Sequence, residues 1–162
     1  MDINEWHDFF IATAGSAAAL TGLIFVGVSI NIQKILSLPK LPDRALLSLI
    51  LLLTILVISS LMLIPRQSYC LIGIEISVIA ISIYILVTKM DIGIYKKTDV
   101  VYKKQYFFSV AFNQLSVLFY LVAGIAILLY GENGIYWIVP GIIFSFIKAV
   151  IDAWVLLVEI NR

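Results

Sequence analysis

Long apolar segments separated by short polar stretches account for most of the chain. They cover about residues 9–33, 45–64, 69–88, 106–130 and 135–158. Each is close to the roughly 20 residues that a helix needs to cross the hydrocarbon core of a bilayer. The pattern therefore predicts an all-α polytopic membrane protein with five transmembrane helices. Residues 1–162 would form a single transmembrane domain, with no soluble domain.

Composition supports the same fold class. Of the 162 residues, 62% are hydrophobic and only 13% are charged, so a soluble domain of this size could not hide the apolar surface. The expected surroundings are the lipid bilayer. The net charge is +1 and the basic residues lie in short connections, which argues against a nucleic-acid partner.

The first apolar segment is unusual because one side of the predicted helix has almost no side chains. It carries no charge, and residues 12–19 are all Ala, Gly, Ser or Thr. Small residues recur at spacings of three, four and seven, and we call this set the small-residue stripe: Gly15, Ala18, Gly22 and Ser29. Membrane helices use such stripes to approach one another closely. The stripe could serve internal packing or an interface between subunits.

The start of the chain argues against a cleaved signal peptide. Signal peptides begin with basic residues and end with small ones, whereas Asp2, Glu5 and Asp8 come first here and the small residues precede the Leu/Ile/Val run. We expect the first helix to be retained. The second segment is the most apolar, and we expect it to be the most exposed to lipid.

Charges in the connections predict the orientation. One side would carry Lys34, Lys40, Arg44, Lys89, Lys96, Lys97, Lys103, Lys104 and Arg162. The other side would carry Arg66 alone among the basic residues, beside several acidic ones. Because basic residues favour the cytoplasm, the N-terminus should lie outside and the C-terminus in the cytoplasm. Residues 89–104 should form a solvated cytoplasmic connection, or bind anionic lipid headgroups.

Ionisable residues inside a membrane are costly and therefore candidates for function. Those within the apolar segments are Glu75, Lys148 and Asp152. Helical spacing places Ser145, Lys148 and Asp152 on one face of the fifth segment, and Asn113, Ser116 and Tyr120 on one face of the fourth. If these two segments form a hairpin, depth matches Asn113 with Asp152, Ser116 with Lys148, Tyr120 with Ser145, and Gly124 with Gly141.

This polar cluster allows several interpretations. Lys148 and Asp152 could form a structural ion pair assisted by Asn113, line a permeation or proton path, or meet another subunit. Glu75 is an isolated acid at the level of Thr13 and Ser16. It could be protonated, hydrogen-bonded to hydroxyl groups, or involved with an ion.

Catalytic chemistry has no support in the sequence. Motifs for acyl transfer, phosphate binding, metalloprotease or dithiol chemistry are missing, and His7 has no second His or Cys nearby to share a metal. Cys70 is the single cysteine, so an intrachain disulfide cannot form. We therefore expect no enzyme activity, no cofactor and no metal.

The opening WHDFFIATAGSAAALTGLIFVGVSIN of residues 6–31 and the LPDRAL of residues 41–46 resemble a known group of proteins. These are small bacterial multi-span membrane proteins, some of them labelled modulators of a membrane protease. The resemblance covers roughly the first third of the chain. It implies a location in the bacterial inner membrane and adds no catalytic residues.

The sequence as a whole predicts a non-enzymatic membrane component with a structural or regulatory role. It would assemble with itself or with another membrane protein through small-residue helix faces. The alternative is a small oligomeric ion channel or transporter that uses Lys148, Asp152 and Asn113.

Overall fold

The structure, a computed structural model, describes residues 3–37, 41–96 and 103–160. Every regular element in these ranges is a helix, so the all-α prediction is confirmed for the described chain. The elements are α1 (Ile3–Ile30), α2 (Ile32–Ser37), α3 (Leu41–Met62), α4 (Tyr69–Lys96), α5 (Lys103–Tyr130), the 3-10 helix η2 (Gly131–Trp137) and α6 (Ile138–Ile160).

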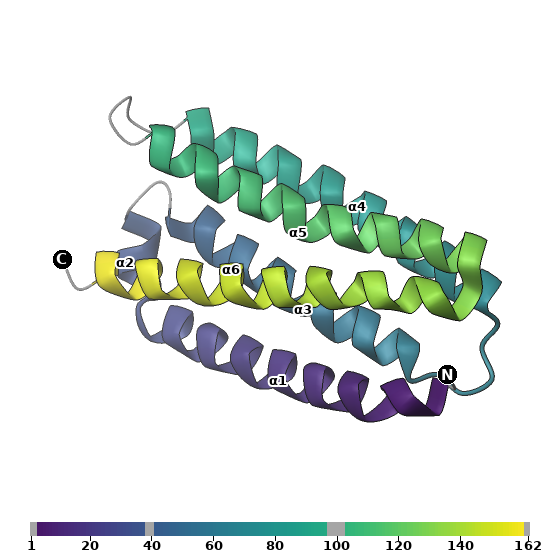
Figure 1. Cartoon of the computed structure of the whole chain (residues 1–162). Helices are drawn as coiled ribbons and strands as arrows, with labels where there is room; N and C mark the ends of the chain where they lie inside the picture. The colour runs from purple at the N-terminus through teal and green to yellow at the C-terminus, as the bar shows by residue number, and fades with distance from the viewer. Residues whose placement is uncertain (1–2, 38–40, 97–102, 161–162) are drawn as a thin grey trace.

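The helices have the length and composition of membrane spans. Four helical stretches of the described chain qualify: Trp6–Ile30, Leu41–Met62, Tyr69–Lys96 and Tyr106–Val158. The last of these covers α5, η2 and α6, and Figure 1 shows α5 and α6 running in opposite directions alongside each other. The two ends of the described chain lie at opposite ends of the bundle. These features fit a membrane protein.

The central helix is α3. It packs against α1, α4 and α6, while α4 and α5 form the most extensive helix pair (Figure 1). The expectation that this segment is the most lipid-exposed is wrong, since Leu51, Leu52, Ile55 and Ile58 are completely buried. A helix that is hydrophobic all round suits either lipid or a protein core, and here helices cover it.

The α5–α6 hairpin depends on two glycines in η2. Gly131 has a φ of 59°, in the left-handed region that favours glycine, and it reverses the chain after Tyr130. Gly134 lies directly against the backbone of Ala126 and Ile127, where a side chain has no room. Pro140 lies in the first turn of α6, where its missing N–H costs no helical hydrogen bond.

Two predicted connections are partly helical. The segment after α1 contains α2, whose Ile35 is buried in a small cluster with Leu41, Ala45 and Leu156. The third span was predicted to end near residue 88, but α4 continues to Lys96. It continues because Val87, Asp91 and Ile94 extend the buried face of the helix at helical spacing. Residues 38–40 and 97–102 of these connections lie outside the described chain.

Candidate functional site

A buried carboxylate joins α4 to α5. Asp91 is 2% exposed, and its Oδ1 accepts hydrogen bonds from the Tyr106 hydroxyl at 3.2 Å and from Asn113 Nδ2 at 2.9 Å. Its Oδ2 accepts one from Gln114 Nε2 at 3.1 Å. Thr88 donates to Gln114 Oε1 at 3.3 Å, which fixes the orientation of that amide. A carboxylate with several donors can be held inside an apolar bundle.

A pair of opposite charges, one helical turn apart, lies on α6. The Lys148 ammonium donates to Asp152 Oδ2, and both side chains are buried. The Lys148 charge also attracts Asp91. At the start of α3, the Arg44 guanidinium carbon lies 5.8 Å from the centre of the Tyr106 ring. Two carboxylates and two basic groups therefore lie close together at one end of the bundle.

We call these side chains the polar network: Arg44, Thr88, Asp91, Tyr106, Asn113, Gln114, Lys148 and Asp152. They come from four helices: hydrogen bonds join α4 to α5, Arg44 of α3 lies over the Tyr106 ring of α5, and the ion pair lies within α6. Its opposite charges balance, which lowers the cost of burying them. One acceptor of the network has no donor: Asn113 Oδ1 is buried and receives no hydrogen bond from the described residues.

The structure brings together some of the predicted site residues and separates others. Tyr120 donates to Ser145 at 3.2 Å, so the α5–α6 contact contains the expected pair. Asn113 was expected to assist Asp152, but its amide donates to Asp91 on α4 instead. Ser116 is buried and donates to the backbone oxygen of Phe112 at 2.9 Å. The polar face of α5 is therefore divided between α4 and α6.

The glycines of α5 and α6 show the same division. A Cβ on Gly141 would lie 2.8 Å from the ring of Tyr120, so this glycine admits the aromatic side chain between α5 and α6. Gly124, expected opposite Gly141, instead faces α4, where its Cβ would lie 3.1 Å from the backbone oxygen of Gly73. Small residues thus allow α5 to approach both of its neighbours closely.

Glu75 is not isolated, as the sequence had suggested. It is half-buried near the start of α4 and accepts a hydrogen bond from Gln67 Nε2 at 2.7 Å. The hydroxyl groups expected near it have other partners. Thr13 shares a hydrogen bond of 2.9 Å with Ser59 of α3, and Ser16 donates to the backbone of Ala12.

The small-residue stripe of α1 lies on the outside of the molecule. Gly15, Ala18, Gly22 and Ser29 are all exposed. At Gly15 and Gly22, no described atom lies within 4 Å of the position that a Cβ would occupy. α1 contacts α3 through the other side of the helix, where Phe10 and Ala17 are buried. The stripe therefore does not serve packing within the described chain.

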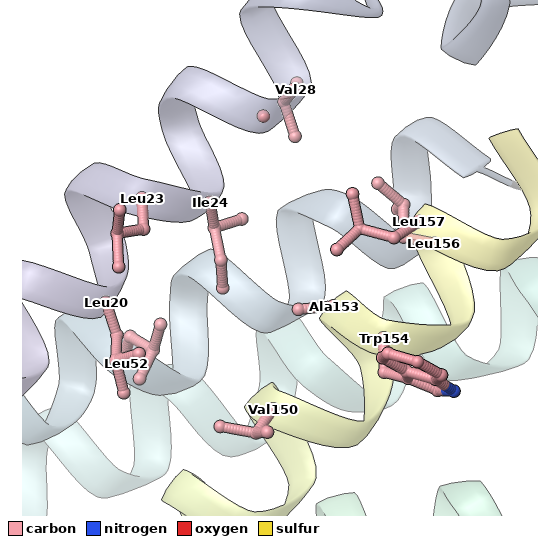
Figure 2. Close-up of a pocket in the computed structure, with 11 residues that line it drawn as sticks. Leu20, Leu23, Ile24, Val28, Leu52, Val150, Ala153, Trp154, Leu156 and Leu157 are labelled. Carbon is pink, nitrogen blue, oxygen red and sulfur yellow. The ribbon is translucent and has the colours of Figure 1, made fainter. Parts of the chain in front are cut away.

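An apolar groove lies between α1 and α6, with α3 at its base (Figure 2). Its volume is about 270 Å³. Leu20 and Ile24 of α1 face Val150 and Leu157 of α6 across it, and Leu52 of α3 lies beneath. The groove forms because α1 packs on α3 and barely touches α6.

Sequence reasoning missed Asp91 and Gln114. Asp91 was assigned to a solvated connection because Lys89, Lys96 and further charges surround it. Its spacing from Val87 and Ile94 was the available signal, because these residues share one helical face. Gln114 gave no such signal, since its neighbour Asn113 already occupied the predicted polar face.

The polar groups described above hold one another by hydrogen bonds and an ion pair. Within residues 3–37, 41–96 and 103–160, no three His, Cys, Asp or Glu side chains gather where they could share a metal ion. The chain matches no protein-family model, no curated protein and no solved structure. Its function is therefore inferred from the contacts described above.

Proposed function

We propose that the chain is a non-enzymatic integral membrane protein that associates with a second copy of itself through the small-residue stripe of α1. It would span a bacterial inner membrane with five helices and act as a structural or regulatory component. The supporting observation is that all four residues of the stripe are exposed and that no described atom lies within 4 Å of the position of a Cβ at Gly15 or Gly22.

Lipid alone does not explain the composition of the stripe. Elsewhere the exposed surface carries large side chains, such as Ile147 and Ile151 on α6, which are 44% and 50% exposed. Between helices in a bilayer, close contact of small residues replaces the hydrophobic drive that operates in water. A surface of nearly bare backbone gains more from another helix than from disordered acyl chains.

The hydroxyl group of Ser29, within the stripe, is compatible with such a contact. It donates to the backbone oxygen of Phe25 at 2.8 Å. It is therefore satisfied within the helix and needs no water. A neighbouring helix could cover it without leaving a donor unpaired.

Measuring the oligomeric state of a variant with one substitution in the stripe tests this proposal. Gly22→Leu adds a large side chain to the stripe where the described chain leaves space, so the folded subunit should keep its thermal stability in detergent. The matched control is Gly93→Leu on α4, since Gly93 also has no described neighbour within 4 Å of a Cβ. Mass measurement in detergent should show a dimer for wild type and Gly93→Leu, and a monomer for Gly22→Leu. Dimers of equal stability in all three would refute assembly through the stripe.

The proposed orientation places the N-terminus outside. In the described chain, Lys34, Arg44 and Lys103 lie at the end of the bundle where α3 and α5 begin, and positive charge favours the cytoplasm. Cys70 is exposed at the start of α4, at the opposite end. A membrane-impermeant maleimide should label Cys70 in intact spheroplasts. Labelling that requires a broken membrane would reverse the orientation.

A channel or transporter is the second candidate, favoured by Asn113 Oδ1, which has no hydrogen-bond partner among the described residues and lies beside buried charges. A conducting protein needs such polar atoms within the membrane. Ion flux in reconstituted vesicles distinguishes the two candidates. Flux that depends on protein and is lost in Asn113→Leu would favour transport, while flux equal to that of empty vesicles would support the assembly role.

A further inference from the structure

The groove between α1 and α6 has the chemistry of a hydrocarbon site. Every side chain that lines it is apolar over the part facing the groove, and Leu20, Ile24, Val150 and Leu157 form its two walls (Figure 2). At about 270 Å³ it is larger than the cavity of about 150 Å³ that accommodates benzene in an engineered protein core. A flexible apolar chain fits this space, and a polar ligand would lose its hydrogen bonds there.

Small residues make the groove wide. Gly27 contributes to the α1 wall and Ala153 to the α6 wall. No described atom lies within 4 Å of the position that a Cβ on Gly27 would occupy. Larger residues at these two positions would close the space. The width therefore depends on side chains that can be changed one at a time.

A basic residue lies near one end of the groove. Val28 lines the groove and also contacts the cluster around Ile35 of α2, so α2 lies at this end. Lys34, the residue before Ile35, is exposed. A positive side chain at a membrane surface attracts an anionic lipid headgroup by about 1 kcal/mol. The apolar groove and Lys34 thus complement the two parts of an anionic phospholipid.

Trp154 fits this assignment. It lies on the rim of the groove and is 67% exposed, and Figure 2 shows its indole ring edge-on beside the α6 ribbon. Tryptophan is enriched where acyl chains meet headgroups. Its position in the last third of α6 places this boundary near α2 and Lys34.

We propose that the groove binds one acyl chain of an anionic phospholipid, with the headgroup held at Lys34. This rests on the proposed membrane location but not on assembly through the stripe. Gly22 follows Leu20 by two residues, or about 200° around the helix, so the stripe and the groove lie on different sides of α1. A copy bound at the stripe would leave the groove open.

Lipid retention tests the proposal. Full-length protein in detergent would be mixed with phosphatidylglycerol and phosphatidylcholine of identical acyl chains, and bound lipid would be counted by native mass spectrometry. Wild type should retain one lipid per chain, with a preference of about fivefold for phosphatidylglycerol, the factor that corresponds to about 1 kcal/mol from one basic residue. Lys34→Gln should abolish the preference.

Ala153→Phe, which fills the groove, should release both lipids, while Gly93→Phe on α4 should retain them. Thermal melting identifies any variant that fails to fold, and Lys34→Gln then tests the site because its side chain is exposed. Equal retention of the two lipids by wild type, or full retention by folded Ala153→Phe, would overturn the proposal. Loss of the dimer in Ala153→Phe without loss of bound lipid would also overturn the proposal, because a second copy of the chain would then be the occupant of the groove. Gly22→Leu should change the oligomer and leave lipid retention intact, which separates the two proposals.

Discussion

Glycine has different surroundings in α1 and in the contact between α4 and α5. Gly73 and Gly124 face each other between α4 and α5, where a Cβ on Gly73 would lie 2.7 Å from Leu128 and 3.0 Å from the Gly124 carbonyl oxygen. At Gly15 and Gly22 of α1, no described atom lies within 4 Å of the position that a Cβ would occupy. The same residue type therefore brings helices together within the subunit in one region and leaves an uncovered surface in the other.

Polar side chains differ between the two regions in the same way. In α4, α5 and α6 several of them bond across helices, as Asn113 does to Asp91 and Tyr120 does to Ser145, although Ser116 bonds to its own backbone. In α1, Thr21 and Ser29 bond to their own backbone. Thr13 is the exception, through its bond to Ser59 of α3. The comparison indicates that the inner helices hold the subunit together, while the outer side of α1 is available to lipid or to a partner.

The largest effect is expected at Asp91. Asp91→Leu removes the acceptor of three hydrogen bonds, two of them from buried side chains, and leaves Lys148 with less negative charge nearby. The free energy of unfolding should fall by about 3–5 kcal/mol, measured by denaturant titration in detergent. Asp91→Asn keeps an acceptor oxygen and should cost less. A loss below about 1 kcal/mol for Asp91→Leu would mean that the network does not hold the helices.

The ion pair on α6 gives the next largest effect. Lys148→Met and Asp152→Leu each leave a buried charge without its partner and should reduce folded yield and stability, by about 3 kcal/mol. The double substitution should recover much of the loss, though not all, because Lys148 also attracts Asp91. Additive losses in the double variant would show that the two residues act separately.

Glycine substitutions test the comparison itself. Gly73→Leu forces a side chain into Leu128 and the backbone of α5, and should lower stability by about 1–3 kcal/mol. Gly93→Leu lies on the same helix but points to a space free of described atoms, and its melting temperature should match that of wild type. If both variants melt alike, the difference between covered and uncovered glycines has no energetic meaning.

The helices were predictable because hydropathy sets them directly. The segments near 69–88, 106–130 and 135–158 fall within observed helices, and the segment near 45–64 extends two residues beyond the end of α3. The position of α3 was not predictable, since burial among helices and contact with lipid both favour Leu and Ile. Only the contacts of α3 with α1, α4 and α6 reveal that it is central.

The candidate site was predictable in part. The spacing of Tyr120 and Ser145 along a hairpin brings them together, and Lys148 and Asp152 pair as residues one turn apart can. The role of Asp91 was hidden because its neighbours in the sequence are charged. The partner of Asn113 depends on how α4 packs against α5. The prediction used only the polar positions of α5 and α6, and these do not determine that packing.

The smallest effect is expected at Tyr120. Tyr120→Phe removes one hydrogen bond to Ser145 and keeps the ring against Gly141, so stability should fall by about 1 kcal/mol. Adding Ser145→Ala removes the remaining unpaired hydroxyl and should not lower stability further. A greater loss in the double variant, measured by thermal unfolding, would show that Ser145 has another role.

Disulfide formation between copies tests assembly through α1 most directly. In a Cys70→Ser background, Gly22→Cys and Gly93→Cys would each be oxidised mildly in native membranes, and covalent dimer would be measured on gels. A disulfide needs Cα atoms about 4.4–6.8 Å apart. Facing positions of two packed helices meet this condition, because the helix axes are about 8–10 Å apart and each Cα lies about 2.3 Å from its axis. Contact through the stripe predicts covalent dimer for Gly22→Cys and little for Gly93→Cys. Dimer from Gly93→Cys alone, or equal amounts from both, would contradict assembly through α1.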